Sequence, residues 1–98
     1  MRILWSERAQ AQVREIFEYI ARDRPMAAER ILEEFLERVA LLTEFREQGV
    51  AWRLPSRPDL RAILHESYRV IYRIKGDEIA ILSVRHTRME PEELPEEP

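Results

Sequence analysis

The clearest indication of the fold is the segment YRVIYRIKGDEIAILSVR, residues 68–85. Its first part, Tyr68–Ile74, places a tyrosine or an aliphatic residue at every second position, which is the period of a β-strand. Lys75–Asp77 contains the glycine of a turn, and Glu78–Arg85 is again rich in aliphatic residues. The stretch therefore predicts two strands joined by a tight turn, with the tyrosine-bearing side of the first strand facing the core.

Two further strands are predicted upstream of this stretch. Leu60–His65 precedes it directly, and Arg2–Trp5 opens the chain with a short strand-like run. Residues 52–59 contain two prolines, which are not tolerated inside a sheet, so a loop is predicted there.

Between the predicted strands Arg2–Trp5 and Leu60–His65, the apolar residues recur with the 3.6-residue period of a helix. Ser6 is a good N-cap for a first helix that runs to about Asp23. Pro25 stops that helix and suits the first turn of a second, which runs to about Phe45 and ends by Gly49. Two or three residues are expected to join the two helices. The apolar positions are Ala9, Val13, Ile16, Phe17 and Ile20, then Ala28, Ile31, Leu32, Phe35, Val39 and Leu42.

The predicted order is therefore strand–helix–helix–strand–strand–strand. This is an α+β fold, with a helical hairpin packed on one face of a mainly antiparallel sheet. The sequence favours one folded domain over residues 1–89. Residues 90–98, EPEELPEEP, form an acidic tail rich in Pro and Glu that is predicted to be disordered.

The composition limits the chemistry. The 98 residues include no cysteine, and the two histidines, His65 and His86, lie far apart in the sequence. We therefore expect no disulfide, no metal and no cofactor. No apolar run is long enough for a signal peptide or a membrane span, so a cytoplasmic protein is expected.

Charge is distributed unevenly along the chain. The net charge is −2 over residues 1–50, +4 over residues 51–89 and −5 over residues 90–98. A basic second half followed by an acidic tail either indicates an acidic partner or is an ordinary solvated surface.

Arginine and isoleucine are interleaved along the last three strands, which suggests a binding face. If the parity of the strands matches, Arg61 with Ile63 and Arg85 with Ile79 and Ile81 join the side opposite the tyrosines. Such a surface binds a partner through both apolar burial and charge, although β-propensity alone also explains isoleucines in strands. The candidate residues are Arg61, Ile63, Arg69, Ile71, Arg73, Arg85, His86, Arg88 and Met89.

These motifs resemble those of the RelE/ParE toxin superfamily. The N-terminal half matches through Ile3–Ala9, Ile16–Asp23 and Pro25–Ala28. Leu60–Ile63, Tyr68–Ile74 and Ile81–Arg88 are similar to the superfamily pattern R-x-I … Y-R-V-I-Y … I-L-x-V-x-H-x-R. The resemblance covers residues 2–89 in the family's order. The ending His86-Thr87-Arg88-Met89 resembles the H-x-R-M ending of ParE members, so the chain looks closer to ParE.

The resemblance implies the toxin of a bacterial type II toxin–antitoxin system, of the kind associated with plasmid stabilisation. Such a toxin is neutralised by a cognate antitoxin that wraps the helical hairpin and the sheet. A ParE-like member would inhibit DNA gyrase by binding it. One alternative is a RelE-like, ribosome-dependent mRNA endoribonuclease, and a second alternative is an inert member that binds only its antitoxin.

A nuclease site would need cations and an acid–base pair. The candidates are Arg61, Arg69, Arg85, His86 and Arg88, and the resemblance places a phosphate-binding arginine at Arg69. Tyr68 and Tyr72 are interpreted as core residues, and no tyrosine follows them. His86, whose imidazole type exchanges protons near neutral pH, is interpreted as either a structural residue or an acid–base group. The sequence therefore favours binding over catalysis.

Overall fold

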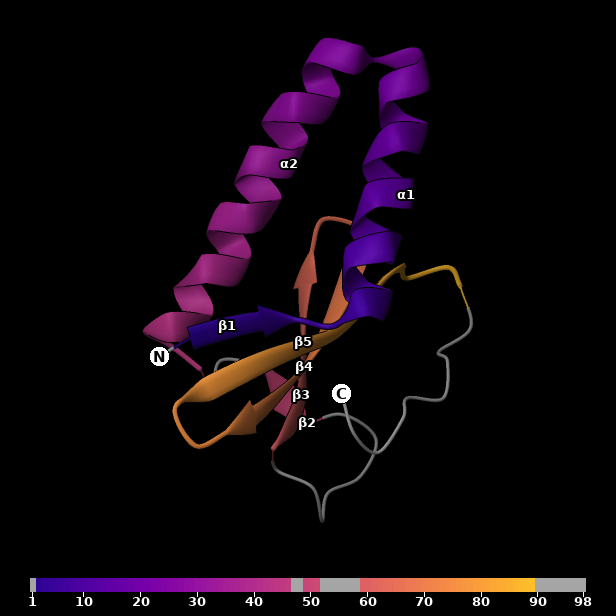
Figure 1. Ribbon diagram of the computed structural model, residues 1–98. Helices are drawn as coiled ribbons and strands as arrows, with labels where there is room; N and C mark the ends of the chain where they lie inside the picture. The colour runs from indigo at the N-terminus through magenta and orange to yellow at the C-terminus, as the bar shows by residue number, and fades with distance from the viewer. Residues whose placement is uncertain (1, 47–48, 52–58, 90–98) are drawn as a thin grey trace.

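The computed structural model describes residues 2–46, 49–51 and 59–89, which form two helices against a five-stranded sheet (Figure 1). The strand order is β1-β5-β4-β3-β2, with β1 parallel to β5 and the other neighbours antiparallel. The predicted α+β fold and its element order are therefore confirmed, with β2 as an unpredicted addition. The elements are β1 (Arg2–Trp5), α1 (Glu7–Asp23), α2 (Pro25–Ala40), the 3-10 turn η1 (Leu41–Thr43), β2 (Val50–Ala51), β3 (Leu60–His65), β4 (Tyr68–Lys75) and β5 (Glu78–His86).

The helical hairpin begins as the sequence predicts. The Ser6 hydroxyl accepts a hydrogen bond from the Ala9 N–H at 3.0 Å, which caps the first turn of α1. Arg24 alone joins the two helices, so the expected linker of two or three residues is wrong. The join is this short because Pro25 already has the backbone φ of a helix and begins α2 directly.

The second helix ends earlier than predicted. The α-helix stops at Ala40, and η1 follows where an α-helix to Phe45 was expected. The N–H groups of Glu44 and Phe45 both donate to the Leu41 carbonyl, which tightens the chain into a turn. This turn buries Leu42 in the core and leaves Leu41 and Phe45 exposed.

Gly49 does not end the second helix, and that expectation is wrong. It is buried, and its N–H donates to the hydroxyl of Tyr72 at 3.0 Å. A Cβ at this position would lie 2.7 Å from the same hydroxyl oxygen and 2.8 Å from the carbonyl oxygen of Ala62. Only glycine lets the backbone approach the sheet this closely.

The core lies between the hairpin and one face of the sheet. Phe35 of α2 is at its centre, with ring centroids 5.8 Å from Phe17, 6.2 Å from Trp5 and 5.9 Å from the imidazole of His65. The tyrosine-bearing side of β4 faces the hairpin, as predicted, and Val70 and Tyr72 are fully buried. Within the described ranges, neither helix is long and apolar enough to span a bilayer. The predicted tail, residues 90–98, lies outside the described residues, as does most of the predicted loop.

Candidate functional site

The predicted binding residues do not share one face of the sheet. Residues that pair directly across antiparallel strands point to the same side. Arg61 pairs with Tyr72, and Ile63 with Val70, so both point toward the helices. Ile63, like Ile79 and Ile81 of β5, belongs to the hydrophobic core. The expected interleaving on one outer face is therefore wrong for these residues.

The opposite face of the sheet, which we call the outer face, keeps Arg69, Ile71, Arg73 and Arg85. Arg69 pairs with Arg85 across β4 and β5, which places two like charges side by side. Ile71 is only 3% exposed and presents no contact surface. The Nε atom of Arg73 lies 3.8 Å from a carboxylate oxygen of Asp59, which favours a structural role for that arginine.

Arg61 also has a structural contact. Its Nη1 atom donates to the carbonyl oxygen of Gly49 at 2.8 Å, so the side chain ties β3 to the chain that leads into β2.

The remaining candidates meet in a groove of about 640 Å³ at the end of β5, here named the β5 groove. His86, Arg88 and Met89 line one side of it together with Arg85. The other wall comes from α1. The lining residues that the sequence reasoning did not propose are Gln12, Glu15, Ile16, Tyr19, Tyr68 and Val84.

His86 organises this end of the sheet. Its imidazole packs edge-on against the ring of Tyr68, with a centroid distance of 5.3 Å. Its Nδ1 atom accepts a hydrogen bond from the N–H of Arg88 at 3.0 Å, and its carbonyl accepts one from Met89 at 3.0 Å. The N–H of Thr87 donates to the Ser67 carbonyl at 2.8 Å. These contacts hold the turn that presents Arg88 and Met89 to solvent.

The groove therefore contains cations and apolar surface, together with a Tyr–His contact. Arginine guanidinium groups bind carboxylates and phosphates, and exposed Tyr19 and Met89 offer apolar surface. Tyr68 was interpreted as a core residue, but it is half-buried and lines the groove. The register that places it opposite His86 could not be read from either strand alone.

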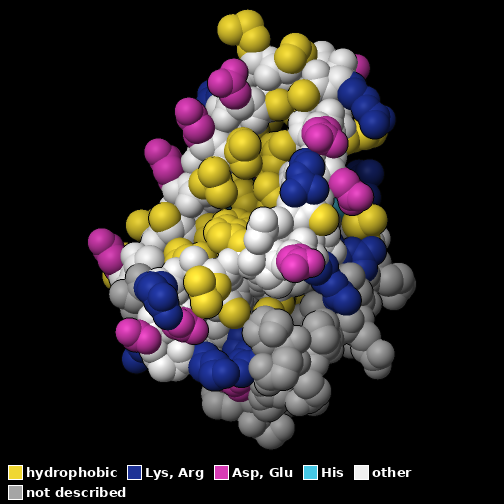
Figure 2. All heavy atoms as spheres, in the orientation of Figure 1, with side chains coloured by type: hydrophobic (Ala, Val, Ile, Leu, Met, Phe, Trp, Pro, Cys, Tyr) yellow, Lys and Arg dark blue, Asp and Glu magenta, His cyan; other side chains and the backbone are white. Residues whose placement is uncertain are grey.

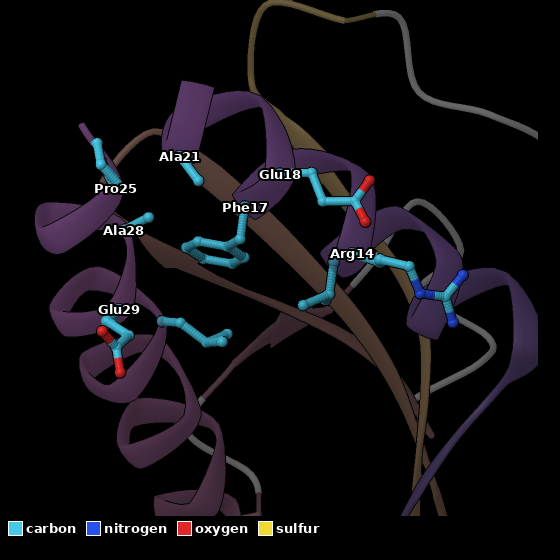
Figure 3. Close-up of a pocket in the computed structure, with 9 residues that line it drawn as sticks. Arg14, Phe17, Glu18, Ala21, Pro25, Ala28 and Glu29 are labelled. Carbon is cyan, nitrogen blue, oxygen red and sulfur yellow. The ribbon is translucent and has the colours of Figure 1, made fainter. Parts of the chain in front are cut away.

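A second groove lies between the two helices and is named here the helical groove. It has a volume of about 340 Å³ and a lining that is almost entirely apolar. Figure 2 shows apolar side chains gathered along the open side of the hairpin. In Figure 3 the Phe17 ring points from α1 into this groove, and Ala28 lies on the opposite wall.

Charged side chains surround the helical groove. Arg14 and Glu18 of α1 extend outward from one side, and Glu29 of α2 lies on the other (Figure 3). The family resemblance implies an antitoxin that wraps the helical hairpin, but the sequence named none of the residues of this groove as a site. Its signal was present in the two amphipathic stripes, of which Val13, Phe17, Ala28 and Leu32 line the groove.

The described part of the chain contains no group of three His, Cys, Asp or Glu side chains that could hold a metal ion.

Comparisons with known proteins agree with this architecture. A family model described as the ParE toxin of the parDE type II toxin–antitoxin system matches residues 3–91. A solved structure of the chromosomal ParDE toxin–antitoxin system from P. aeruginosa is similar, with a TM-score of 0.74 and 24% sequence identity. The match covers 88% of this chain and 95% of the other. No curated protein matches the chain.

Proposed function

Since the chain belongs to the ParE toxin family of type II toxin–antitoxin systems, we propose that it inhibits DNA gyrase by binding and that a cognate antitoxin neutralises it. In this proposal the β5 groove contacts the target and the helical groove receives the antitoxin. A protein that acts by binding needs exposed, well-held contact residues rather than an acid–base pair.

The observation that carries the gyrase proposal is the hydrogen bond from the Arg88 N–H to Nδ1 of His86. An Nδ1 atom that accepts this bond carries no proton, so the imidazole acts as a cap for the turn. We therefore assign His86 a positioning role, with Arg85, Arg88 and Met89 as the contact residues.

The antitoxin proposal is supported by the helical groove. A contiguous apolar surface on a small protein often marks a binding site, whereas single exposed apolar residues are common on any protein surface. The groove runs between two antiparallel helices and is apolar along its floor, which suits the apolar face of a third helix. Arg14, Glu18 and Glu29 lie where charges at the edges of such a helix would meet them.

A gyrase supercoiling assay with the purified chain tests the first part. We expect inhibition that falls at least tenfold in Arg88→Ala and stays near the original level in the matched variant Arg22→Ala. Arg22 is exposed at the far end of α1 and lines neither of these grooves. Gyrase activity that is unaffected by the chain at micromolar concentration would contradict the proposal.

The contact between Tyr68 and His86 favours one second candidate, an mRNA endoribonuclease. A phenol and an imidazole beside Arg85 and Arg88 are groups that can move protons and hold a phosphate. Toeprint mapping on translating ribosomes distinguishes the two functions. Codon-positioned cuts that disappear in Tyr68→Phe, with gyrase untouched, would establish the nuclease. If neither assay shows an effect, the remaining function is that of an inert family member that binds only its antitoxin.

A further inference from the structure

One row of side chains on the outer face carries an exposed leucine beside two arginines. Leu64 of β3 pairs with Arg69 of β4, which in turn pairs with Arg85 of β5, so the three side chains point to the same side of the sheet. We call these three residues the outer row. Leu64 is 60% exposed, and both helices lie against the opposite face of the sheet (Figure 1). The outer row therefore offers one apolar and two cationic contacts on a face that neither helix covers.

The outer row fits an acidic segment that also carries an apolar side chain. Two guanidinium groups directly opposite each other repel, and carboxylates that lie over both of them lower that repulsion. The row runs across the strands, and the backbone N–H and C=O groups of β4 already pair with β3 on one side and β5 on the other. An occupant of the row must therefore bind through its side chains, and it needs no backbone donor of its own.

The chain's own C-terminal tail has this composition. Residues 90–98 contain five glutamates, no lysine or arginine, and a single leucine, Leu94. The other three residues are prolines, which favour an extended chain and lack the N–H that a strand needs. Such a segment is poorly suited to extend a sheet at its edge, but it can lie across the face of one.

The tail is also long enough to cross the outer row. It starts directly after Met89, three residues beyond the end of β5. Leu94 follows Met89 by five residues, which span about 15 Å in an extended chain with three residues per turn. The outer row covers two strand spacings, or about 10 Å. A segment tethered this closely has a local concentration on the order of millimolar, so weak contacts are enough to bring it onto the row.

We propose that the acidic tail folds back over the outer row, with glutamates on Arg69 and Arg85 and with Leu94 against Leu64. The contact is dynamic and leaves the melting temperature unchanged, because exposed ion pairs each contribute little stability. Arg85 also lines the β5 groove, so the tail competes in cis with a target that binds this arginine. That competition rests on the function proposed above, whereas the docking of the tail does not.

Paramagnetic relaxation enhancement in NMR spectra of the full chain tests the docking. The sequence contains no cysteine, so Pro95→Cys provides a single site for a nitroxide label next to Leu94. Outside the tail, we expect the strongest broadening at Leu64 and Arg69, and we expect about 1 M NaCl to remove it by screening. Met26, which is exposed at the start of α2, is the internal control and should not broaden.

Two results of this experiment would overturn the proposal. The strongest broadening at Ile16 and Tyr19 would place the tail in the β5 groove instead of on the outer row. Broadening confined to the residues next to the label in the sequence would mean that the tail does not dock at all.

Two controls separate the tail of the same chain from other causes. In a mixture of isotope-labelled chain without the cysteine and unlabelled chain with the nitroxide, we expect no broadening at Leu64. Broadening in this mixture would mean that the tail of a second copy fills the row, and the cis contact would be wrong. A labelled variant with glutamine at all five tail glutamates keeps the length and the prolines, and it should lose the broadening at Leu64. Broadening that persists in this variant would overturn docking by charge. The five changes are Glu90→Gln, Glu92→Gln, Glu93→Gln, Glu96→Gln and Glu97→Gln.

The gyrase supercoiling assay measures the competition. If the tail covers Arg85 for about half of the time, the apparent affinity for the target falls about twofold. The variant with five glutamines, without the label, should therefore inhibit at about half the concentration that the unaltered chain requires. Equal inhibition by the two chains would overturn the competition, even where the tail docks. If neither chain inhibits gyrase, the gyrase proposal fails, and the label experiments still decide whether the tail docks.

Discussion

At the level of single residues, Tyr72 is the side chain that joins the part of the chain after α2 to the sheet. Its hydroxyl donates to the Arg46 carbonyl at 2.7 Å and accepts from the Gly49 N–H at 3.0 Å, while its ring is fully buried. Arg61 adds a third hydrogen bond, to the Gly49 carbonyl. A buried phenol is normally retained only where its hydroxyl has partners, and here both partners are backbone groups of one connection.

This arrangement makes Gly49 far less replaceable than the chain's other glycine. Gly49→Ala forces a Cβ against the Tyr72 hydroxyl and the Ala62 carbonyl, so we expect a loss of about 2–4 kcal/mol in unfolding free energy. Gly76 has a φ of +60° and nothing within 4 Å of the position that a Cβ would occupy, so Gly76→Ala should cost only about 1 kcal/mol. Urea denaturation measures both, and equal losses would show that the close approach at Gly49 is not a constraint.

At the scale of elements, α1 separates the two grooves. Phe17 and Val13 turn toward α2 and line the helical groove, whereas Ile16 and Tyr19 turn toward the end of β5. The apolar stripe of α1 predicts a helix with a single buried face. In the structure, Ala9 and Phe17 are buried, and the other positions of the stripe are only partly covered. The uncovered part of the stripe is the surface that the proposals assign to partners.

A substitution in the floor of the helical groove tests that assignment. Ala21→Arg places a long side chain inside the apolar groove, so we expect antitoxin affinity to fall at least tenfold, because that side chain would occupy the space proposed for the apolar face of the antitoxin helix. Ala40→Arg is the matched control, since Ala40 is exposed on α2 and lines neither groove. Isothermal titration calorimetry of both variants measures the difference. An unchanged antitoxin affinity in Ala21→Arg would contradict an antitoxin site in the helical groove.

At the scale of the whole molecule, a 98-residue chain with two open grooves has a small core. A domain of this size buries a smaller fraction of its surface than a larger one does, so its stability is modest. A partner that binds only the folded chain therefore contributes a substantial share of the total unfolding free energy.

We accordingly expect antitoxin to raise the thermal stability of the chain. At a free antitoxin concentration of 100 times Kd, linkage adds about 2.7 kcal/mol to the unfolding free energy. Differential scanning calorimetry compares the midpoint of thermal unfolding of the chain alone with that of the chain co-expressed with the protein encoded beside it. An unchanged midpoint, together with failure to co-purify, would argue against a cognate antitoxin at that locus.

The acidic tail is expected to contribute nothing to folding. Residues 90–98 consist of five glutamates, three prolines and one leucine, a composition with little apolar surface to bury. Deletion of these residues should leave the melting temperature within experimental error. A drop of several degrees would mean that the tail packs on the domain.

Local patterns in the sequence were enough to predict both helices, every strand except β2, and the order of these elements. The period-two stretch 68–85, the two helical stripes and the Ser6 cap depend on neighbours in the chain, so local spacing was enough to predict them. The family resemblance rested on the same local motifs, and the match over residues 3–91 confirms it.

Which residues meet depends on how the strands pair, and local patterns do not show this. Alternation along one strand shows that Arg61 and Ile63 share a side, but not which side of the sheet that is. The register between strands decides this, and it turned both residues toward the helices. In the same way, the contact of Tyr68 with His86 and the fit of Gly49 against Tyr72 join residues 18 to 23 positions apart in the sequence. Such contacts depend on strand pairing and on the path of the chain after α2, neither of which leaves a periodic signal in the sequence.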